Sequence, residues 1–254
     1  MKTILVTGGV KGIGWGISQK FVKNGYQLAI VDITSPEANA ENLSSLDENE
    51  YPYVYVKADI SNLDEHQRIL DAILARFGRI DILVNNAGIV TRRGDMMEVP
   101  VTSFDDTINT NLRGTFFLTQ KIGNHMRAQE EIEGYRGIIV NISSMNAAVV
   151  STSRAEYSMS KAGISSLTQH LAVRLGPESI FVYEIRPGII YTIKTQEVKA
   201  RYDKITSSSD EMVINRWGLP EDIAEAAYAL CANDLRYCTG QVITVDGGYA
   251  TRRL

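Results

Sequence analysis

The most informative stretch of the chain is Thr7-Gly8-Gly9-Val10-Lys11-Gly12-Ile13-Gly14, which follows the apolar run Thr3–Val6 and opens the helical pattern Ile13–Lys23. Glycines here permit a tight turn and let backbone N–H groups approach a pyrophosphate at a helix N-terminus. A second apolar run ends at acidic Asp32, roughly 20 residues further on, where a carboxylate accepts hydrogen bonds from ribose hydroxyls. A glycine-rich turn alone is weak evidence, but this strand, helix and acidic residue together predict a dinucleotide-binding turn.

Short β-branched runs alternate with longer amphipathic stretches along the whole chain. Strands are predicted at Thr3–Val6, Leu28–Val31, Tyr53–Val56, Ile82–Val84, Ile138–Ile142, Val182–Ile185 and Val242–Val245. Helices are predicted at Ile13–Lys23, Leu63–Phe77, Phe104–Met126, Ala162–Leu175 and Glu221–Ala232. Near-continuous apolar runs suit strands covered on both faces. The alternation therefore predicts a doubly wound α/β fold, with a Rossmann-type parallel seven-stranded sheet and helices on both faces.

Length and composition predict one globular domain over residues 1–254. The 254 residues are 44% hydrophobic and 22% charged, with no linker or internal repeat to divide them. The net charge of −4 argues against nucleic acid as the partner. No apolar run is long enough for a membrane span or a signal peptide, which predicts a cytoplasmic protein. Cys231, Cys238 and three scattered histidines lack the spacing of metal ligands, so no metal is expected.

One polar stretch, Thr192–Asn215, breaks the regular pattern and contains Ser207-Ser208-Ser209. An irregular insert of about 20 residues inside a compact domain is usually a functional lid or a mobile loop. The sequence therefore predicts a substrate lid over residues 192–215.

The pair Tyr157 and Lys161 is spaced i, i+4, which places both side chains on one face of a helix. A phenol with a pKa near ~10 is a poor base at neutral pH unless a cation stabilises the phenolate. Lys161 supplies that cation, so Tyr157 is predicted to exchange a proton with the oxygen of a carbonyl or an alcohol. The same spacing also occurs often by chance, so the alternative is that both residues simply lie on the exposed face of an amphipathic helix.

A serine pair, Ser143-Ser144, ends the predicted strand Ile138–Ile142. Ligands of open α/β sheets bind at the carboxyl ends of strands, where a serine hydroxyl can polarise a reacting oxygen. The strand pattern by itself leaves the choice between Ser143 and Ser144 open.

These features identify the chain as resembling the short-chain dehydrogenase/reductase family, in its branch of ~250 residues and over its whole length. The resemblance is closest to bacterial 3-oxoacyl-[acyl-carrier-protein] reductase-like proteins, a group that includes many sugar and polyol dehydrogenases. The matching motifs are Thr7–Gly14, Asp59, Asn85-Asn86-Ala87-Gly88, Asn111, Ser144, Tyr157-x-x-x-Lys161, Pro187-Gly188 with Thr192, and Asp246-Gly247-Gly248.

The resemblance implies a role for each matching residue. Ser144, by its interval to Tyr157, is the substrate-orienting serine, and Tyr157 is the acid/base. Lys161 lowers the pKa of Tyr157 and holds the nicotinamide ribose, while Asn111 kinks its helix and holds a water that links Lys161 to solvent. The implied cofactor-binding residues are Gly8, Lys11, Gly12, Ile13, Gly14, Asp32, Ile33, Asp59, Ile60, Asn86, Ala87, Gly88, Tyr157, Lys161, Pro187, Gly188, Ile190 and Thr192.

Departures from the family pattern point to a polar, hydroxyl-rich substrate. Tyr191 stands where many relatives carry an acidic residue, and Ile193-Lys194 follow Thr192. Arg154 and Glu156 precede Tyr157 and are expected either to face the substrate or to form ordinary solvated surface. The expected activity is NAD(P)-dependent interconversion of a secondary alcohol and a ketone. The alternatives are an NADPH-dependent 3-oxoacyl-[acyl-carrier-protein] reductase and a cofactor-binding sensor without turnover.

Two residues bear on the choice of cofactor. Asp32 would repel the 2′-phosphate of NADP, whereas Lys11 would attract it, and a single exposed lysine offsets only part of that repulsion. NAD is therefore the expected cofactor, with NADP as the alternative. The family resemblance also implies a homotetramer whose long helices, within Phe104–Met126 and Ala162–Leu175, pack across a subunit interface.

Overall fold

A single parallel sheet forms the centre of the molecule, in a computed structural model that describes residues 1–90, 94–233 and 235–251. Its seven strands lie in the order β3-β2-β1-β4-β5-β6-β7, and every neighbouring pair is parallel. The strands are β1 (Thr3–Thr7), β2 (Gln27–Asp32), β3 (Tyr53–Lys57), β4 (Ile82–Asn85), β5 (Gly137–Ile142), β6 (Ile180–Pro187) and β7 (Val242–Val245). The predicted seven-stranded Rossmann-type sheet is confirmed.

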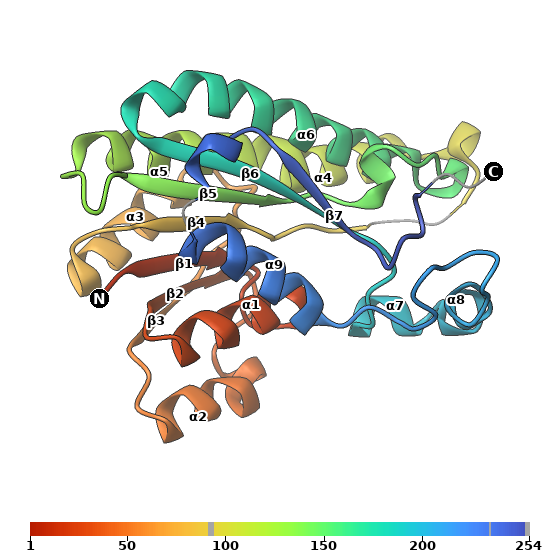
Figure 1. The fold of residues 1–254 in the computed structure, drawn as a ribbon, viewed down its shortest axis with the longest axis horizontal. Coiled ribbons are helices and arrows are strands. Elements are labelled where there is room, and N and C mark those ends of the chain that lie inside the picture. The colour runs from red at the N-terminus through yellow and green to blue at the C-terminus, as the bar shows by residue number, and fades with distance from the viewer. Residues whose placement is uncertain (91–93, 234, 252–254) are drawn as a thin grey trace.

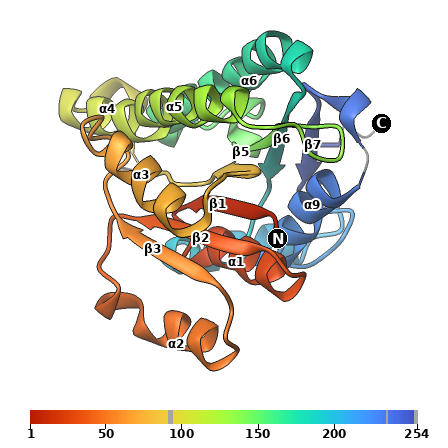
Figure 2. The same ribbon diagram turned by 90° about the vertical axis from the view of Figure 1, so that its left-hand side faces the viewer.

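Helices cover both faces of this sheet (Figures 1 and 2). One face carries α1 (Gly12–Lys23), α2 (Ala40–Glu48) and α9 (Pro220–Ala232). The other face carries α3 (Glu65–Phe77), α4 (Val101–Ile108), α5 (Thr115–Ala128) and α6 (Ala155–Leu175). Alternate residues of each strand enter the two resulting cores, as Val182 and Tyr183 of β6 do. Burial on both faces explains why the strands read as continuous apolar runs.

The strand order reverses direction between β1 and β4. Chain connections leave β1 toward β2 and β3 on one side and leave β4 toward β5, β6 and β7 on the other. A crevice opens outside the carboxyl ends of the strands at such a point, and ligands of doubly wound sheets bind there. The residues that follow β1 and β4 are therefore the first place to look for a site.

The predicted helix Phe104–Met126 is interrupted in the structure. Between α4 and α5 the backbone forms a π-helical segment, Asn109–Gly114, whose wider turns break the regular hydrogen-bond pattern. Gly114 permits this path because a Cβ there would lie 2.4 Å from the carbonyl oxygen of Ile60. The kink that the family resemblance implied at Asn111 thus takes the form of a π-helical segment.

Three further boundaries differ from the sequence-based prediction. Helix α2 was not predicted, because only Leu43 and Leu46 of its nine residues are buried and its apolar pattern is short. Helix α6 begins at Ala155, seven residues earlier than predicted, so Tyr157 and Lys161 both lie on it. The stretch 192–215, predicted to be irregular, contains two short helices, α7 (Ile193–Gln196) and α8 (Lys199–Thr206). Within the described residues, no helix combines the length and apolar character of a membrane span.

Candidate active site

The glycine turn after β1 forms a cradle at the N-terminus of α1. Gly8 and Gly12 have φ values of +61° and +53°, in the left-handed region that glycine adopts without strain. A Cβ on Gly14 would lie 2.1 Å from the carbonyl oxygen of Gly8, so only glycine allows the helix to approach the turn this closely. Lys11 is the residue that precedes α1, and its side chain has no acceptor for the first N–H groups of the helix. With Ile13 in the first turn, this cradle fits the pyrophosphate of a dinucleotide.

The end of β4 holds the glycine turn in place. The side-chain amide of Asn86 donates to the carbonyl oxygens of Thr7 and Gly8 at 2.9 and 3.1 Å. In return, the Thr7 hydroxyl accepts from the backbone N–H groups of Asn86 and Ala87, each at 3.0 Å. Thr7 was quoted in the motif but not predicted as a site residue, and it joins the two strands on either side of the switch point.

Two acidic residues lie at the ends of the next strands outward. One carboxylate oxygen of Asp32, at the end of β2, accepts from the backbone and hydroxyl of Thr34 at 3.0 and 2.7 Å. Asp59, after β3, holds Ser61 in the same way at 2.9 and 2.8 Å. The neighbour of Asp32, Ile33, is exposed, whereas the neighbour of Asp59, Ile60, is buried. Each turn fixes its carboxylate at the carboxyl edge of the sheet, on the β2–β3 side of the cradle.

Lys161 is the most deeply buried charged group of the predicted catalytic set. Its ammonium nitrogen donates to the carbonyl oxygen of Ile142 at 2.9 Å and lies 5.8 Å from the ring centroid of Tyr157. Burial, and to a lesser extent the positive charge of Lys194, lower the pKa of Lys161 to about 8. The carboxylate of Glu184 acts in the opposite direction. Tyr157 and Lys161 thus share one helix face, as predicted.

Asn111 links the π-helical segment to this centre. Its amide oxygen accepts from the backbone N–H of Ile89 at 2.7 Å, and its amide nitrogen donates to the Ile89 carbonyl oxygen at 2.9 Å. The same nitrogen donates to the hydroxyl of Ser160 on α6 at 3.1 Å. Gly88 lies between them, because a Cβ on it would be 3.1 Å from the Asn111 amide oxygen and 3.6 Å from Lys161 Nζ. Asn111, Gly88 and Lys161 therefore meet at one point.

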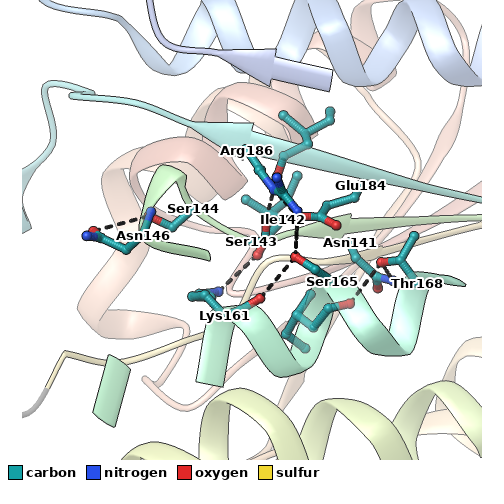
Figure 3. Close-up of polar contacts among 12 residues, drawn as sticks. Asn141, Ile142, Ser143, Ser144, Asn146, Lys161, Ser165, Thr168, Glu184 and Arg186 are labelled. Atoms are coloured by element: carbon teal, nitrogen blue, oxygen red, sulfur yellow. Dashed lines mark hydrogen bonds and ion pairs between the residues drawn. The ribbon is translucent and has the colours of Figure 1, made fainter. Parts of the chain in front are cut away.

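The two serines after β5 have different surroundings. Ser143 donates to the carboxylate of Glu184 at 2.5 Å and is engaged in a buried cluster between β6 and α6. The Ser144 hydroxyl accepts from the backbone N–H of Asn146 at 3.1 Å, at the start of the turn that follows β5 (Figure 3). This geometry favours Ser144 as the serine that faces a ligand.

The chain after β6 returns to the glycine cradle. A Cβ on Gly188 would lie 2.5 Å from the Cβ of Asp246, so Pro187 and Gly188 pass directly against the end of β7. Ile190 is buried, and Thr192 lies against the cradle, because a Cβ on Gly12 would be 3.3 Å from its methyl group. Residues 180 positions apart in the sequence are thus in contact at the site.

The two charged residues before Tyr157 behave differently from each other. Glu156 is buried, and its carboxylate accepts from the hydroxyl of Ser103 on α4 at 3.3 Å, so the expectation that it faces a substrate or forms solvated surface is wrong. It lies on the side of α6 that packs against α4, and burial there explains the difference. The Arg154 guanidinium stays beside the site, 5.9 Å from the Tyr157 ring centroid.

Two features of the site went beyond the sequence-based predictions, in which Lys194 was only a departure from the family pattern and Glu184 and Arg186 were not singled out. Lys194, on α7, donates to the carbonyl oxygen of Gly88 at 2.7 Å and so spans the cradle. Glu184 and Arg186 form an ion pair of 2.7 Å in β6, under α6. The signal for the pair was present, because two charges interrupt an otherwise apolar strand that the fold buries on both faces. Across the described ranges, no three His, Cys, Asp or Glu side chains gather as a metal site requires.

Comparison with known proteins gives a consistent result. Residues 8–250 match a family model described as enoyl-(acyl carrier protein) reductase. The chain is 32% identical over 251 residues to 2-dehydro-3-deoxy-D-gluconate 5-dehydrogenase from Dickeya dadantii, covering 99% of this chain and 96% of the relative.

Solved structures match as completely. The 3-oxoacyl-[acyl-carrier protein] reductase from Brucella melitensis, in complex with NAD, superposes with a TM-score of 0.94 at 37% identity, covering 100% of this chain and 98% of that one. A short-chain dehydrogenase from Burkholderia cenocepacia, in complex with NADP, gives a TM-score of 0.86 at 29% identity, covering 98% and 97%.

Proposed function

The chain belongs to the short-chain dehydrogenase/reductase family, and from that premise we propose that it is an NAD-dependent dehydrogenase of a polar, hydroxyl-rich substrate. It is an oxidoreductase that acts on CH–OH groups and interconverts a secondary alcohol and a ketone. The proposal is supported by the Tyr157–Lys161 pair on α6, whose lysine contacts the end of β5 just before Ser144, at the same edge of the sheet as a cradle that fits a dinucleotide.

Each polar side chain has a distinct task in this proposal. Ser144 holds the reacting oxygen, and Tyr157 takes the hydroxyl proton in oxidation or returns it in reduction. The Lys161 ammonium stabilises the Tyr157 phenolate electrostatically and holds the ribose. Asn111 fixes the π-helical segment beside Lys161 and, as the family resemblance implies, holds a water that leads protons to solvent. The bound nicotinamide supplies the hydride acceptor in oxidation and the hydride donor in reduction.

The cofactor contacts follow the cradle and the strand ends. Gly8, Gly12, Ile13 and Gly14 hold the pyrophosphate, and Asp32 accepts from the ribose hydroxyls of the adenosine. The remaining contacts come from Lys11, Ile33, Asp59, Ile60, Asn86, Ala87, Gly88, Pro187, Gly188, Ile190 and Thr192. The Asp32 carboxylate favours NAD, since it would repel a 2′-phosphate.

The segment 192–215 is proposed as the substrate lid. Its α8 contributes Tyr202 to a small apolar cluster with Met145 and Ile189, and Met145 directly follows Ser144. Trp217 donates to Asp203 of α8 at 2.8 Å and packs edge-on against Tyr202. A segment with its own apolar underside beside Ser144 is suited to cover a substrate and exclude water.

A panel of alcohols and ketones tests this proposal. Polyols, aldonates, hydroxysteroids and 3-oxoacyl thioesters are assayed with NAD(H) and NADP(H), following the reduced nicotinamide by absorbance. Turnover of polyols or aldonates with NAD is the expected result. Preferred turnover of 3-oxoacyl thioesters with NADPH would instead favour the acyl reductase, which Lys11 and the similarity to the Brucella protein support. Binding without turnover of any compound would indicate a sensor.

A cytoplasmic homotetramer is proposed as the working form. Exposed apolar side chains mark the outer helices, with Phe104 on α4 38% exposed, Phe116 on α5 41% exposed and Val173 on α6 80% exposed. Apolar groups on adjacent helices suit burial against a second copy of the chain. Light scattering on the purified protein tests this, and a monomer at micromolar concentration would contradict it.

A further inference from the structure

Strand β6 carries a fully buried carboxylate that the proposed reaction does not use. Glu184 is 0% exposed, and its Oε1 atom accepts from the Ser143 hydroxyl at 2.5 Å, the Ser165 hydroxyl at 2.7 Å and Arg186 Nε at 2.7 Å. Arg186 also donates to the Ser165 hydroxyl at 3.0 Å. Figure 3 shows the Glu184 and Arg186 side chains turned toward Ser165 on α6, with Ser143 and Lys161 beside them. Placing a carboxylate here has a high desolvation cost, which its three donors partly offset.

Both hydroxyl partners of Glu184 adjoin the contacts of Lys161. Ser143 follows Ile142, whose carbonyl oxygen accepts from Lys161 Nζ at 2.9 Å. Ser165 lies one helical turn beyond Lys161, and its hydroxyl contacts the Lys161 carbonyl oxygen at 3.3 Å. The carboxylate therefore lies behind the lysine and ties β5, β6 and α6 together there. Glu184 Oε2 finds no hydrogen-bond partner within the part of the chain that the structure describes.

Three elements bring charged or titratable groups toward Lys161. Tyr157 lies on its own helix, Lys194 comes from α7, and Glu184 comes from β6 with Arg186 behind it. Burial and the Lys194 charge both lower the pKa of Lys161, and the Glu184 carboxylate raises it. Lys161 thus loses its proton as the pH rises through about 8, and Glu184 is the anion that delays this loss.

We propose that Glu184 is a positioning residue of the active site, whose buried carboxylate holds the Lys161 ammonium charged and in place beneath Tyr157. This inference rests on the proposed function, because the Lys161 charge matters for turnover only if Tyr157 is the acid/base. A purely structural role is the competing explanation, in which Glu184 only neutralises Arg186. The two explanations differ in one respect, which is whether loss of the carboxylate changes the titration of Lys161.

The test compares Glu184→Gln with the wild-type chain. The amide keeps the size and the acceptor oxygen but removes the charge. NMR of the protein labelled at the lysine Cε carbons, with the Lys161 signal assigned by Lys161→Arg, gives the titration midpoint directly. We expect the pH of this midpoint, and the apparent pKa of the alkaline limb of kcat/KM for ketone reduction, to fall by roughly half a unit to one unit. This apparent pKa falls whether Tyr157 or Lys161 deprotonates first, because removal of a nearby anion favours deprotonation of both groups.

The matched control is Glu178→Gln, at the other end of β6. Glu178 also pairs with arginines, because its carboxylate accepts from Arg127 at 2.5 Å and from Arg174. It lies before β6 begins, away from the carboxyl edge of the sheet. The same change of charge there should move neither the Lys161 midpoint nor the limb. Restoration of the limb in Glu184→Asp would show that the charge, rather than the side-chain length, is responsible.

Each outcome has a clear meaning. An active Glu184→Gln variant with an unmoved Lys161 midpoint overturns the inference and leaves the structural explanation. A lowered midpoint in a protein that turns over no alcohol or ketone supports the electrostatic role of Glu184 while the proposed function fails. If the single variant does not fold, Glu184→Gln combined with Arg186→Met removes both charges of the pair. The midpoint is still expected to fall, but by less than in the single variant, because loss of the partly exposed Arg186 cation acts in the opposite direction.

Discussion

The cofactor cradle and the Lys161 centre lie at the same edge of the sheet but are built in opposite ways. The cradle depends on glycines that lack a side chain, since a Cβ on Gly14 would lie 2.1 Å from the carbonyl oxygen of Gly8. The Lys161 centre depends on side chains: the buried ammonium donates to a carbonyl oxygen of β5, and the Glu184 carboxylate of β6 favours its charged form. Backbone geometry binds a ligand common to many enzymes, whereas buried charge tunes one reaction at the expense of stability. Substitutions in the two regions should therefore fail differently.

The largest effect is expected at the Lys161 centre. Tyr157→Phe removes the acid/base proton and keeps the ring, so turnover should fall on the order of 10²–10⁴-fold, the usual scale for general acid–base catalysis. Thermal stability and cofactor affinity should change little, because the hydroxyl is the only group lost. Steady-state kinetics with calorimetric binding of cofactor checks both parts. A variant that keeps more than half of wild-type turnover would remove Tyr157 from its role.

The cradle should show the reverse pattern. Gly14→Ala forces a methyl group against Gly8 and the Asn86 amide, which a closely packed turn relieves only by moving apart. We expect cofactor affinity to fall by about tenfold or more and the free energy of unfolding to fall by about 1–3 kcal/mol. Gly176→Ala is the control, because no described atom lies within 4 Å of its added Cβ. Equal behaviour of the two variants would contradict the close approach.

A smaller effect, on the preference between NAD and NADP, is expected at the charged residues beside the cradle. Asp32→Ala removes a carboxylate that would repel a 2′-phosphate by about 4 kcal/mol at 4 Å and an effective dielectric constant near 20, less after screening by salt. The ratio of kcat/KM for NAD to that for NADP should fall by roughly tenfold. Lys11→Ala should move the ratio the other way. If wild type prefers NADPH, or Asp32→Ala leaves the ratio unchanged, the acyl reductase alternative gains support.

The smallest effect is a change in protection rather than in rate. Residues 192–215 should exchange amide hydrogens rapidly in the free protein and more slowly with cofactor and substrate bound. The reason is that α7 and α8 are short, with Lys194 in contact with Gly88 and Tyr202 packed beside Met145. Hydrogen exchange read by mass spectrometry provides the comparison, with β5 as the protected reference. Slow exchange of the segment in both states would make it a rigid structural element.

Local patterns predicted the parts of the site that depend on neighbours in sequence. The stretch around Thr7–Gly14 reads as a strand, a turn and a helix because four glycines follow a β-branched run and leave few other conformations. Helix α2 was not predicted because two leucines are too few for a clear helical pattern, and only the fold shows that they are buried in the core shared with α1 and the sheet. Likewise, the strand pattern does not distinguish Ser143 from Ser144. The family resemblance favours Ser144 by its interval to Tyr157, and the contact of Ser143 with Glu184 gives the physical reason.

The sequence by itself determined the sheet, most of its longer helices, the glycine cradle and the Tyr157–Lys161 pair. Periodicity and backbone freedom are properties of short segments, so they can be read without knowing what lies alongside. Only the tertiary structure decided which charges share a buried space: Glu156 turned toward α4, Lys194 reached Gly88, and Glu184 came to lie behind Lys161. Electrostatic energy depends on distance and on exclusion of water, and both are set only when distant strands and helices pack together.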